Sequence, residues 1–164
     1  MNYDVIIIGA GPGGIFAAYE LVQKNPELKV AVFEAGHALN KRHCPIDGDK
    51  IKTCIGCKSC SIMSGFGGAG AFSDGKLSLS YEVGGDLPQL IGEDYAQEMI
   101  NYADKIYLEF GADTHVEGLE NTEEVKAIRT RAIQAGLKLV DCPIRHLGTE
   151  KAQEIYYAIV GADN

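Results

Sequence analysis

The sequence predicts an α/β fold in which a parallel sheet is flanked by helices. An apolar, β-branched run at residues 3–8 is followed by a glycine-rich turn at residues 9–14 and then by a helical pattern. A second apolar run at residues 29–33 ends at an acidic residue. Strand, glycine turn, helix and second strand, in this order, are typical of the start of a Rossmann-like dinucleotide-binding domain.

The glycine turn places Gly9, Gly11 and Gly14 at the spacing of G-x-G-x-x-G. We expect Gly9 to allow the tight turn out of the strand, Gly11 to let the backbone approach a pyrophosphate, and Gly14 to let the helix pack closely on the strand. The pyrophosphate would accept hydrogen bonds at the start of the helix, where the helix dipole favours negative charge. An ordinary glycine-rich turn is the alternative.

The first helix and the second strand add context to this motif. Apolar residues keep helical spacing from Ile15 to residue 24, and Asn25-Pro26 should end the helix. The second strand then presents Glu34 to the hydroxyls of an adenosine ribose. Its carboxylate would repel a 2′-phosphate, which disfavours NADP. A simple surface charge is the alternative interpretation of Glu34.

Composition is that of a soluble globular protein, with 46% hydrophobic and 23% charged residues among 164. The formal net charge of −8 disfavours nucleic acids and anionic membranes as partners. We expect neither a transmembrane helix nor a secretory signal, because the sequence has no long apolar span and no basic leader. Five cysteines in such a chain indicate reduced thiols, metal binding or redox chemistry, and a cytoplasmic location.

Residues 37–86 form a glycine- and cysteine-rich segment of low regularity, which we interpret as a functional insertion near a cofactor. Cys54, Cys57 and Cys60 form C-x-x-C-x-x-C, and Cys44-Pro45 lies upstream. This spacing suits an iron–sulfur cluster or a zinc site, with Cys44 or the more remote Cys142 as fourth ligand. A redox dithiol and purely structural thiols are the alternatives.

A second glycine-rich loop follows the cysteines. Its small residues would let the backbone approach a flat or charged ligand, at Gly67, Gly68, Ala69 and Gly70. Ser73 and Asp74 add a hydroxyl and a carboxylate for a ribityl chain. Phe66 and Phe72 favour a packed loop, with a flexible linker as the alternative. Residues 77–81 alternate like a strand.

Residues 87–164 are expected to be mainly helical. Asn121 with Glu124 resembles a capping box. The expected elements are a helix from Tyr95 to Phe110 that stops at Gly111, a helix from Asn121 to Gly136, a strand at 137–140, and a last helix that Thr149 caps.

Two segments of the sequence resemble known flavoproteins. Gly9-x-Gly11-x-x-Gly14-x-x-x-Ala18-x-x-Leu21, followed by residues 34–36, resembles the FAD-binding start of the glutathione-reductase-type superfamily, in which a proline such as Pro12 is common. The string from Cys44-Pro45 to Leu77 is similar to a narrower group of bacterial and archaeal FAD-dependent dehydrogenases whose substrate is generally unassigned, and residues 145–149 also fit that group.

The resemblance implies FAD as cofactor. Its adenosine ribose would lie on Glu34 and its pyrophosphate on Gly11, Pro12, Gly13 and Gly14. Ala35 would also contact the cofactor, and Arg42 would lie beside it. Residues 67–74 would lie near the ribityl chain and the flavin ring.

The resemblance also implies more protein than these residues. Family members are longer and carry a later Gly-Asp motif over the FAD, which residues 161–164 do not match. We therefore expect residues 1–164 to be a single FAD-binding domain or an amino-terminal fragment that works with a second chain or a carboxy-terminal half.

The predicted function is an FAD-dependent oxidoreductase that acts on a small-molecule substrate with NAD(P)H or another electron carrier. An NAD-dependent dehydrogenase and a non-catalytic nucleotide- or metal-binding fragment are the alternatives. The sequence identifies no catalytic acid or base. His146 is the one plausible candidate, with an ordinary loop residue as the alternative interpretation.

Overall fold

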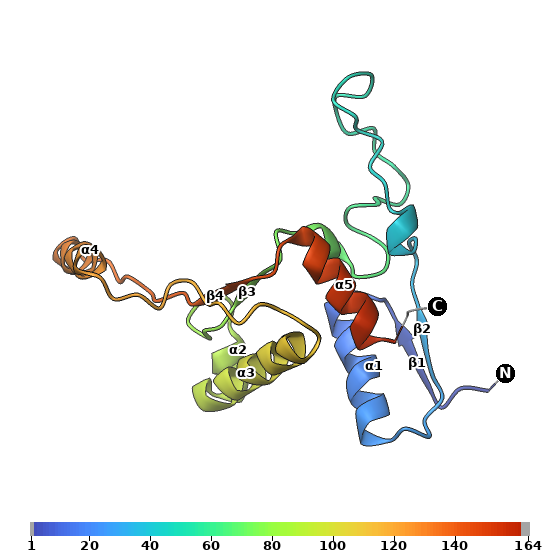
Figure 1. Cartoon of the computed structure of the whole chain (residues 1–164), viewed down its shortest axis with the longest axis horizontal. Coiled ribbons are helices and arrows are strands. Elements are labelled where there is room, and N and C mark those ends of the chain that lie inside the picture. The colour runs from blue at the N-terminus through green and yellow to red at the C-terminus, as the bar shows by residue number, and fades with distance from the viewer. Residues whose placement is uncertain (1, 162–164) are drawn as a thin grey trace. The chain divides into compact units, whose positions relative to one another are not determined.

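The protein is a mixed α/β chain that divides into two compact units (Figure 1). The computed structural model describes residues 2–161. The first unit contains residues up to Gly75 together with those from Gly148 onward, and the second contains Lys76–Leu147. The zones expected at 37–86 and 87–164 each contribute to both units.

The first unit begins with the predicted βαβ arrangement. Strand β1 is Val5–Ile8, helix α1 is Pro12–Lys24 and strand β2 is Val30–Phe33. The two strands pair in parallel, with Val5 opposite Val30 and Ile8 opposite Phe33. The predictions for these three elements are confirmed.

Helix α1 packs on β1 through the glycine turn. Gly9 has a φ of +102°, which a residue with a side chain adopts only under strain. A Cβ on Gly14 would overlap the Gly9 carbonyl group. Both glycines therefore have the local roles that the motif predicts. Ile15 and Ala18 on the same helix are buried and hold it against the strands.

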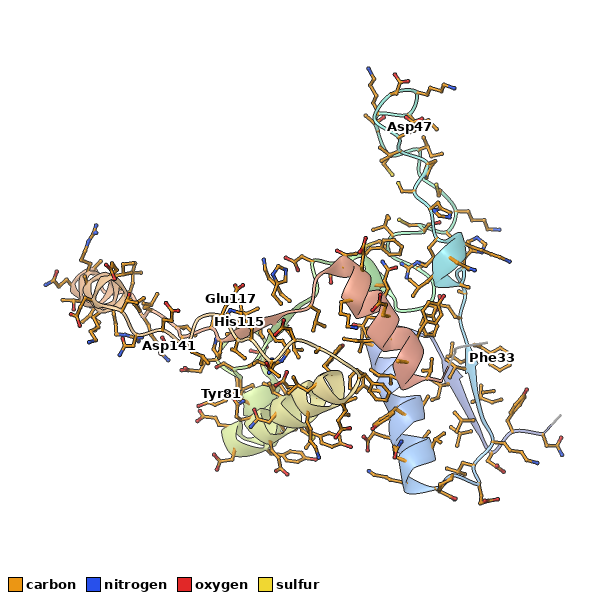
Figure 2. All side chains as sticks on the ribbon, in the orientation of Figure 1. Phe33, Asp47, Tyr81, His115, Glu117 and Asp141 are labelled. Carbon is orange, nitrogen blue, oxygen red and sulfur yellow. The ribbon has the colours of Figure 1, made fainter. Side chains whose placement is uncertain are left out.

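The parallel sheet is small and covered only in part. It consists of β1 and β2 alone in the part of the chain that the structure describes. Ile8 is 88% exposed and Phe33 is 55% exposed, and Figure 2 shows the Phe33 side chain standing free of other elements. Parallel sheets in proteins are normally covered on both faces. One βαβ unit is thus present, and its sheet has no further strands among residues 2–161.

Helix α5, Thr149–Ile159, completes the core of the first unit. Ile155, Tyr156 and Ile159 are buried on it. The predicted cap was wrong in one respect, because Gly148 is the N-cap and Thr149 is the first helical residue. The Thr149 hydroxyl instead donates a hydrogen bond to the Ser73 carbonyl at 2.7 Å. Residues 162–164 lie outside the described residues.

Two short 3₁₀ helices shape the segment between β2 and the end of the first unit. Helix η1, Leu39–Lys41, precedes the cysteine-bearing loop, and η2, Ala69–Phe72, lies within the second glycine loop. The loop between them carries Asp47 at its far end (Figure 2). There the Asp47 carboxylate accepts hydrogen bonds from the N–H groups of Asp49 and Ile51 at 2.9 Å each.

The second unit contains an antiparallel strand pair and three helices. Strands β3, Lys76–Ser78, and β4, Ile144–His146, pair with Leu77 opposite Arg145. The helices are α2, Leu87–Ile91, α3, Glu93–Glu109, and α4, Glu123–Gln134. None of the helices in residues 2–161 is long and apolar enough to cross a membrane.

Three predictions for the second unit need correction. The strand expected at 77–81 is shorter and begins one residue earlier. The strand expected at 137–140 does not form, since β3 takes residues 144–146 as its partner. The cap of α4 is Thr122 rather than Asn121, because the Thr122 hydroxyl accepts the Val125 N–H at 3.3 Å. The helix over 95–110 is confirmed in α3.

A buried ion pair joins β4 to α3. The Arg145 guanidinium donates to both carboxylate oxygens of Asp104, at 2.5 and 2.8 Å, and to the Asp113 carbonyl at 2.5 Å. The side chains of Arg145 and Asp104 are only 5% and 15% exposed. The hydrogen bonds that Arg145 donates to Asp104 raise the pKa of its guanidinium above the ordinary value, against the opposing effect of burial. Arg145 is therefore a structural residue of the second unit.

Candidate dinucleotide-binding site

The start of α1 has no side-chain cap. Its N-cap is Gly11, which has no side chain to accept a hydrogen bond, and Pro12 at the first helical position has no N–H. The first turn contains no acidic residue. In any α-helix the first N–H groups lack helical partners, so those of Gly13 and Gly14 can donate to an anion.

The second glycine loop packs directly on this turn. The Gly67 N–H donates to the Ala10 carbonyl at 2.7 Å. A Cβ on Gly68 would lie 3.1 Å from the Gly11 Cα, closer than most real contacts. Glycine at position 68 thus lets two backbone segments that are far apart in sequence meet. The structure brings the two sequence-predicted glycine loops together at the start of α1.

Glu34 connects three segments of this site. One carboxylate oxygen accepts the Ala10 N–H at 2.8 Å, and the other accepts those of Gly36 at 2.8 Å and Gly65 at 3.0 Å. These bonds, led by that from Ala10, lower the pKa of Glu34 below its ordinary value of 4.5, against the opposing effect of burial. The carboxylate is therefore charged at neutral pH.

The ribose contact proposed for Glu34 stays a prediction. A carboxylate offers about four lone-pair positions, and three N–H donors already occupy its oxygens here. One position remains for a ribose hydroxyl. Ala35 beside it is exposed, as a residue at the mouth of such a site would be.

Arg42 has a structural role that the sequence did not predict. Its side chain is buried, and its guanidinium lies 4.6 Å from the centre of the Phe72 ring. It donates to four backbone carbonyl oxygens, those of Ser61 at 2.8 Å, Ile62 at 2.8 Å, Phe66 at 2.6 Å and Gly68 at 2.9 Å. Burial lowers the pKa of Arg42, while the charge of Glu34 opposes this shift. Arg42 thus fixes the second glycine loop, and its expected contact with a cofactor stays a prediction.

The remaining cofactor candidates lie on the exposed end of the second loop. Ala69, Ser73 and Asp74 are exposed, and Gly70 is partly buried. The Ser73 hydroxyl donates to the Gly70 carbonyl at 2.8 Å. These positions are compatible with the predicted ribityl contacts, which stay predictions.

Helix α5 supplies residues that sequence reasoning missed. The Gln153 amide donates to the Ala71 carbonyl at 2.8 Å, and the Phe66 and Tyr157 rings stack with centroids 4.9 Å apart. The Tyr156 hydroxyl lies 3.0 Å from where a Gly70 Cβ would stand. No motif marks these positions, and the amphipathic spacing of the helix was the one available signal.

The cysteines are all free thiols. Cys44, Cys54, Cys57 and Cys60 are exposed, and Cys142 is partly buried in the second unit. In the described residues no three Cys, His, Asp or Glu side chains converge as ligands of a single metal ion.

His146 lies on a strand rather than in a loop, which corrects the sequence interpretation. It ends β4, opposite Lys76, and its side chain is exposed. Its role as a catalytic acid or base stays a prediction.

Replacing Glu34 with glutamine should destabilise the first unit. The glutamine side chain keeps one acceptor oxygen, but its NH2 group faces a backbone N–H, and two donors cannot form a hydrogen bond. We expect a loss of about 2 kcal/mol in the free energy of unfolding at neutral pH, because hydrogen bonds to charged groups contribute roughly 1.5–3 kcal/mol. Urea denaturation followed by circular dichroism measures it.

The pH dependence of this loss provides the control. A lowered folded-state pKa stabilises the fold above pH 4.5, and this contribution disappears as the pH falls through the folded-state pKa. The difference between wild type and Glu34→Gln should therefore shrink below pH 4.5. Asp4→Asn, which alters an exposed carboxylate that accepts the Lys29 N–H at 2.9 Å, should have a smaller effect. Equal effects of the two variants would contradict the role of Glu34.

One protein family and several individual proteins match part of the chain. Residues 1–40 match the Thi4 family. Over 35 residues the chain is 60% identical to the thiamine thiazole synthase of Phaeosphaeria nodorum and 57% identical to that of Yarrowia lipolytica, in each case 21% of this chain and 11% of the relative. Over 73 residues, 44% of this chain and 13% of the relative, it is 38% identical to an uncharacterized protein of Clostridium beijerinckii. No solved structure matches significantly.

These matches concern a small part of each relative. The family match ends at residue 40 and so covers β1, the first glycine turn, α1, β2 and Glu34. It supports the FAD-binding superfamily at this segment and does not single out the glutathione-reductase type. The amino-terminal βαβ unit of this chain is similar to that of the Thi4 family.

Proposed function

We propose that the first unit binds the adenosine diphosphate half of FAD and that the chain is part of a flavin-dependent oxidoreductase. When bound, the flavin supplies the redox chemistry, and the residues of this chain bind and orient it. The substrate is a small molecule, with NAD(P)H or another electron carrier as the partner in electron transfer.

The observation that carries the proposal is the junction of two glycine loops at the uncapped start of α1. Gly11 places no side chain there, and a Cβ on Gly13 would meet no atom within 4 Å. Free helical N–H groups beside open space suit the charge and size of a pyrophosphate. Glu34, at the end of β2, has one acceptor position left for the ribose.

The second glycine loop favours FAD over NAD. Both cofactors contain adenosine diphosphate, so the turn at Gly9–Gly14 does not distinguish them. Gly68, which is partly buried, and the exposed Ala69 extend a surface of small residues beyond that turn, which suits a second, flat and bulky group. The helix pattern with Ala18 and Leu21 agrees with this preference.

Calorimetric titration of the purified chain with FAD, ADP and NAD⁺ tests the cofactor. We expect FAD to bind most tightly and ADP to compete with it. An absorbance spectrum of the purified chain should show flavin. A colourless chain that binds NAD⁺ more tightly than FAD would overturn the proposal in favour of an NAD-dependent dehydrogenase.

Replacing Gly11 with alanine tests the position of the pyrophosphate. The φ of Gly11 is −75°, which alanine adopts freely, and the new Cβ would lie 4.0 Å from the Gly68 Cα. The fold should survive, but the methyl group occupies the approach to the helix N–H groups. Loss of one charged hydrogen bond predicts FAD binding weaker by about tenfold or more.

A matched control keeps this test sharp. Ala17→Ser also adds one heavy atom to α1, at an exposed position away from the turn, and should leave FAD binding unchanged. Unaltered FAD affinity in Gly11→Ala would show that the pyrophosphate lies elsewhere.

A second candidate is a synthase resembling the thiamine thiazole synthases. The identity of 60% over 35 residues to one of them favours it. The 35 matched residues are about as many as the βαβ unit that we propose to bind the cofactor. Enzymes with unrelated activities can share such a unit. Formation of a thiazole product by the purified chain would establish the synthase, and its absence alongside FAD reduction would favour the oxidoreductase.

A further inference from the structure

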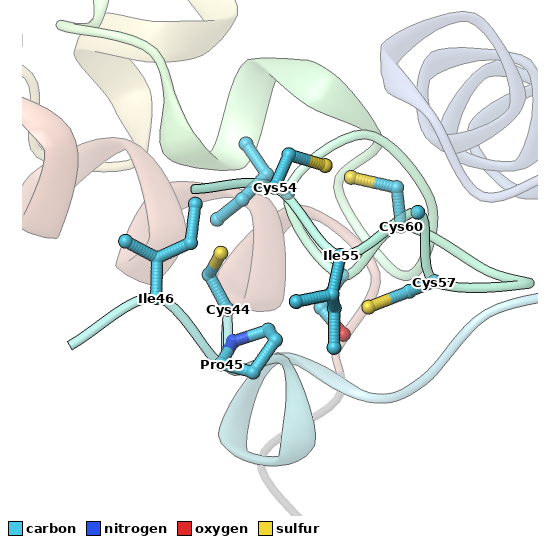
Figure 3. Close-up of a pocket in the computed structure, with 10 residues that line it drawn as sticks. Cys44, Pro45, Ile46, Cys54, Ile55, Cys57 and Cys60 are labelled. Carbon is cyan, nitrogen blue, oxygen red and sulfur yellow. The ribbon is translucent and has the colours of Figure 1, made fainter. Parts of the chain in front are cut away.

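We propose that Cys44, Cys54, Cys57 and Cys60 bind an iron–sulfur cluster of the [4Fe–4S] type. All four line a single pocket of about 140 Å³ in the loop between η1 and η2 of the first unit (Figure 3). The βαβ unit and the glycine loops do not use them. The proposal is therefore independent of FAD binding.

The spacing of the thiols fits a cluster better than a single zinc ion. C-x2-C-x2-C places three thiolates in one short loop, and in bacterial ferredoxins this run is combined with a cysteine that precedes proline elsewhere in the chain. Cys44-Pro45 is such a cysteine, ten residues before Cys54. Structural zinc sites with four cysteines usually consist of two separate C-x2–4-C pairs, and this loop has no second pair.

The surroundings of the thiols are apolar. Pro45, Ile46, Ile55 and Ile62 line the pocket beside the four cysteines. Side chains of this kind exclude water, and solvent exposure is one of the factors that set the potential of a cluster. In the view of Figure 3 the sulfur atoms of Cys54 and Cys60 point toward one another. A pocket with four thiols and an aliphatic lining matches a group whose ligands are sulfur. Ile46 and Ile55 are 41% and 60% exposed, so closure of the loop around the cluster would be needed to shield it from water.

One side of the pocket is held in place. The Cys60 carbonyl accepts the N–H groups of Met63 at 3.1 Å and Ser64 at 2.8 Å. Arg42 donates to the carbonyls of Ser61 and Ile62. Cys60 therefore lies on an ordered turn, immediately before the second glycine loop.

The other thiols have to close around the cluster. No three potential ligands of a single metal ion converge in the described residues, and the side chains of all four cysteines are exposed. Ligand loops commonly order when the metal binds, because the free energy of binding is used to fold them. Such ordering requires one ligand that is already held in place, here Cys60. It also requires ligands in the same loop that are free to move, here the exposed thiols of Cys44, Cys54 and Cys57.

Metal and sulfide analysis of the full chain tests the site. The chain is purified without oxygen and incubated with ferric iron, sulfide and a thiol, which reduces part of the iron to give the mixed ferric and ferrous state of the cluster. Unbound ions are then removed. We expect about four iron atoms and about four sulfide ions per chain, as the cluster type requires. The dithionite-reduced sample should give the electron paramagnetic resonance signal of a reduced cluster, which flavin does not produce.

Serine variants locate the ligands. Cys44→Ser, Cys54→Ser, Cys57→Ser and Cys60→Ser should each lose at least half of the iron and sulfide, whereas Cys142→Ser in the second unit should retain both. Far-ultraviolet circular dichroism should be unchanged in all five, because the four exposed thiols pack against little. FAD affinity, measured in parallel, separates failure of this site from failure of the proposed function.

Three results would overturn the proposal. The first is a folded chain that takes up no iron and sulfide. The second is binding of one zinc ion per chain in preference to iron and sulfide. The third is equal loss of iron in Cys142→Ser and in the four loop variants, which would indicate adventitious binding.

Discussion

Arg42→Ala is expected to lower the free energy of unfolding of the first unit by at least about 3 kcal/mol. The guanidinium serves four backbone carbonyl oxygens between Ser61 and Gly68, and each acceptor left buried without a donor costs roughly 1–3 kcal/mol. Some of the carbonyls will find water in the space that the side chain leaves, so the loss is smaller than the sum. Urea denaturation followed by circular dichroism measures it.

Two further variants test this explanation. Lys41→Ala removes a neighbouring positive charge that is exposed, and should change the stability by less than about 0.5 kcal/mol. Arg42→Lys keeps the charge but replaces a planar fork with one ammonium group, which cannot reach all four carbonyls. The stability of Arg42→Lys should therefore be close to that of Arg42→Ala. Full stability in Arg42→Lys would show that charge alone matters.

Asp104→Ala is expected to have a comparable effect on the second unit. It leaves the Arg145 charge buried without its carboxylate, and breaking a buried pair in this way typically costs about 3–5 kcal/mol. Amide hydrogen exchange should become faster in β3 and β4, since Arg145 belongs to β4. Protection of the first unit's helix α1 should change little.

The second unit contains its own control for this experiment. Arg129 and Asp141 also form an arginine–aspartate pair, at 2.6 Å, but their side chains are 36% and 63% exposed. Exposed pairs contribute about 0–1 kcal/mol, so Asp141→Ala should be nearly neutral. If the two aspartate variants destabilise the chain equally, burial does not determine the strength of these pairs.

The βαβ unit could be predicted from the sequence because its signals are local. A strand of β-branched residues, a glycine turn and a helical pattern each occupy adjacent positions, and the pairing of β1 with β2 follows from the order of the elements. The roles of Gly9 and Gly14 followed for the same reason. The backbone of a turn depends on its own residues more than on distant ones.

The strand pair of the second unit could not be predicted in the same way. Each of its strands has three residues, which is too short for an alternating pattern to stand out. The run at 137–140 has a stronger apolar pattern than 144–146, but only the latter meets β3. Pairing between distant segments decides which short run becomes a strand.

The sequence predicted which residues belong to the candidate dinucleotide-binding site, but it did not predict the contacts between them. Glu34 was expected to face a ribose, and its bonds to Ala10 and Gly65 were not foreseen. Gly65 is 31 residues from Glu34 in a segment without periodicity, so nothing in the sequence indicates the contact. Arg42 and Arg145 were missed as buried residues, because arginine is usually exposed unless its donors are satisfied.

The return of α5 to the first unit has a consequence for synthesis on the ribosome. Residues 2–75 emerge before their closing helix, and residues 76–147 are translated in between. At about 5–20 residues per second, roughly 4–15 s pass before Ile155 and Tyr156 can cover α1 and the second glycine loop. During that interval the nascent βαβ unit exposes apolar surface, and the second unit can fold first. The order of synthesis thus means that the first unit cannot be completed until the whole second unit has been translated.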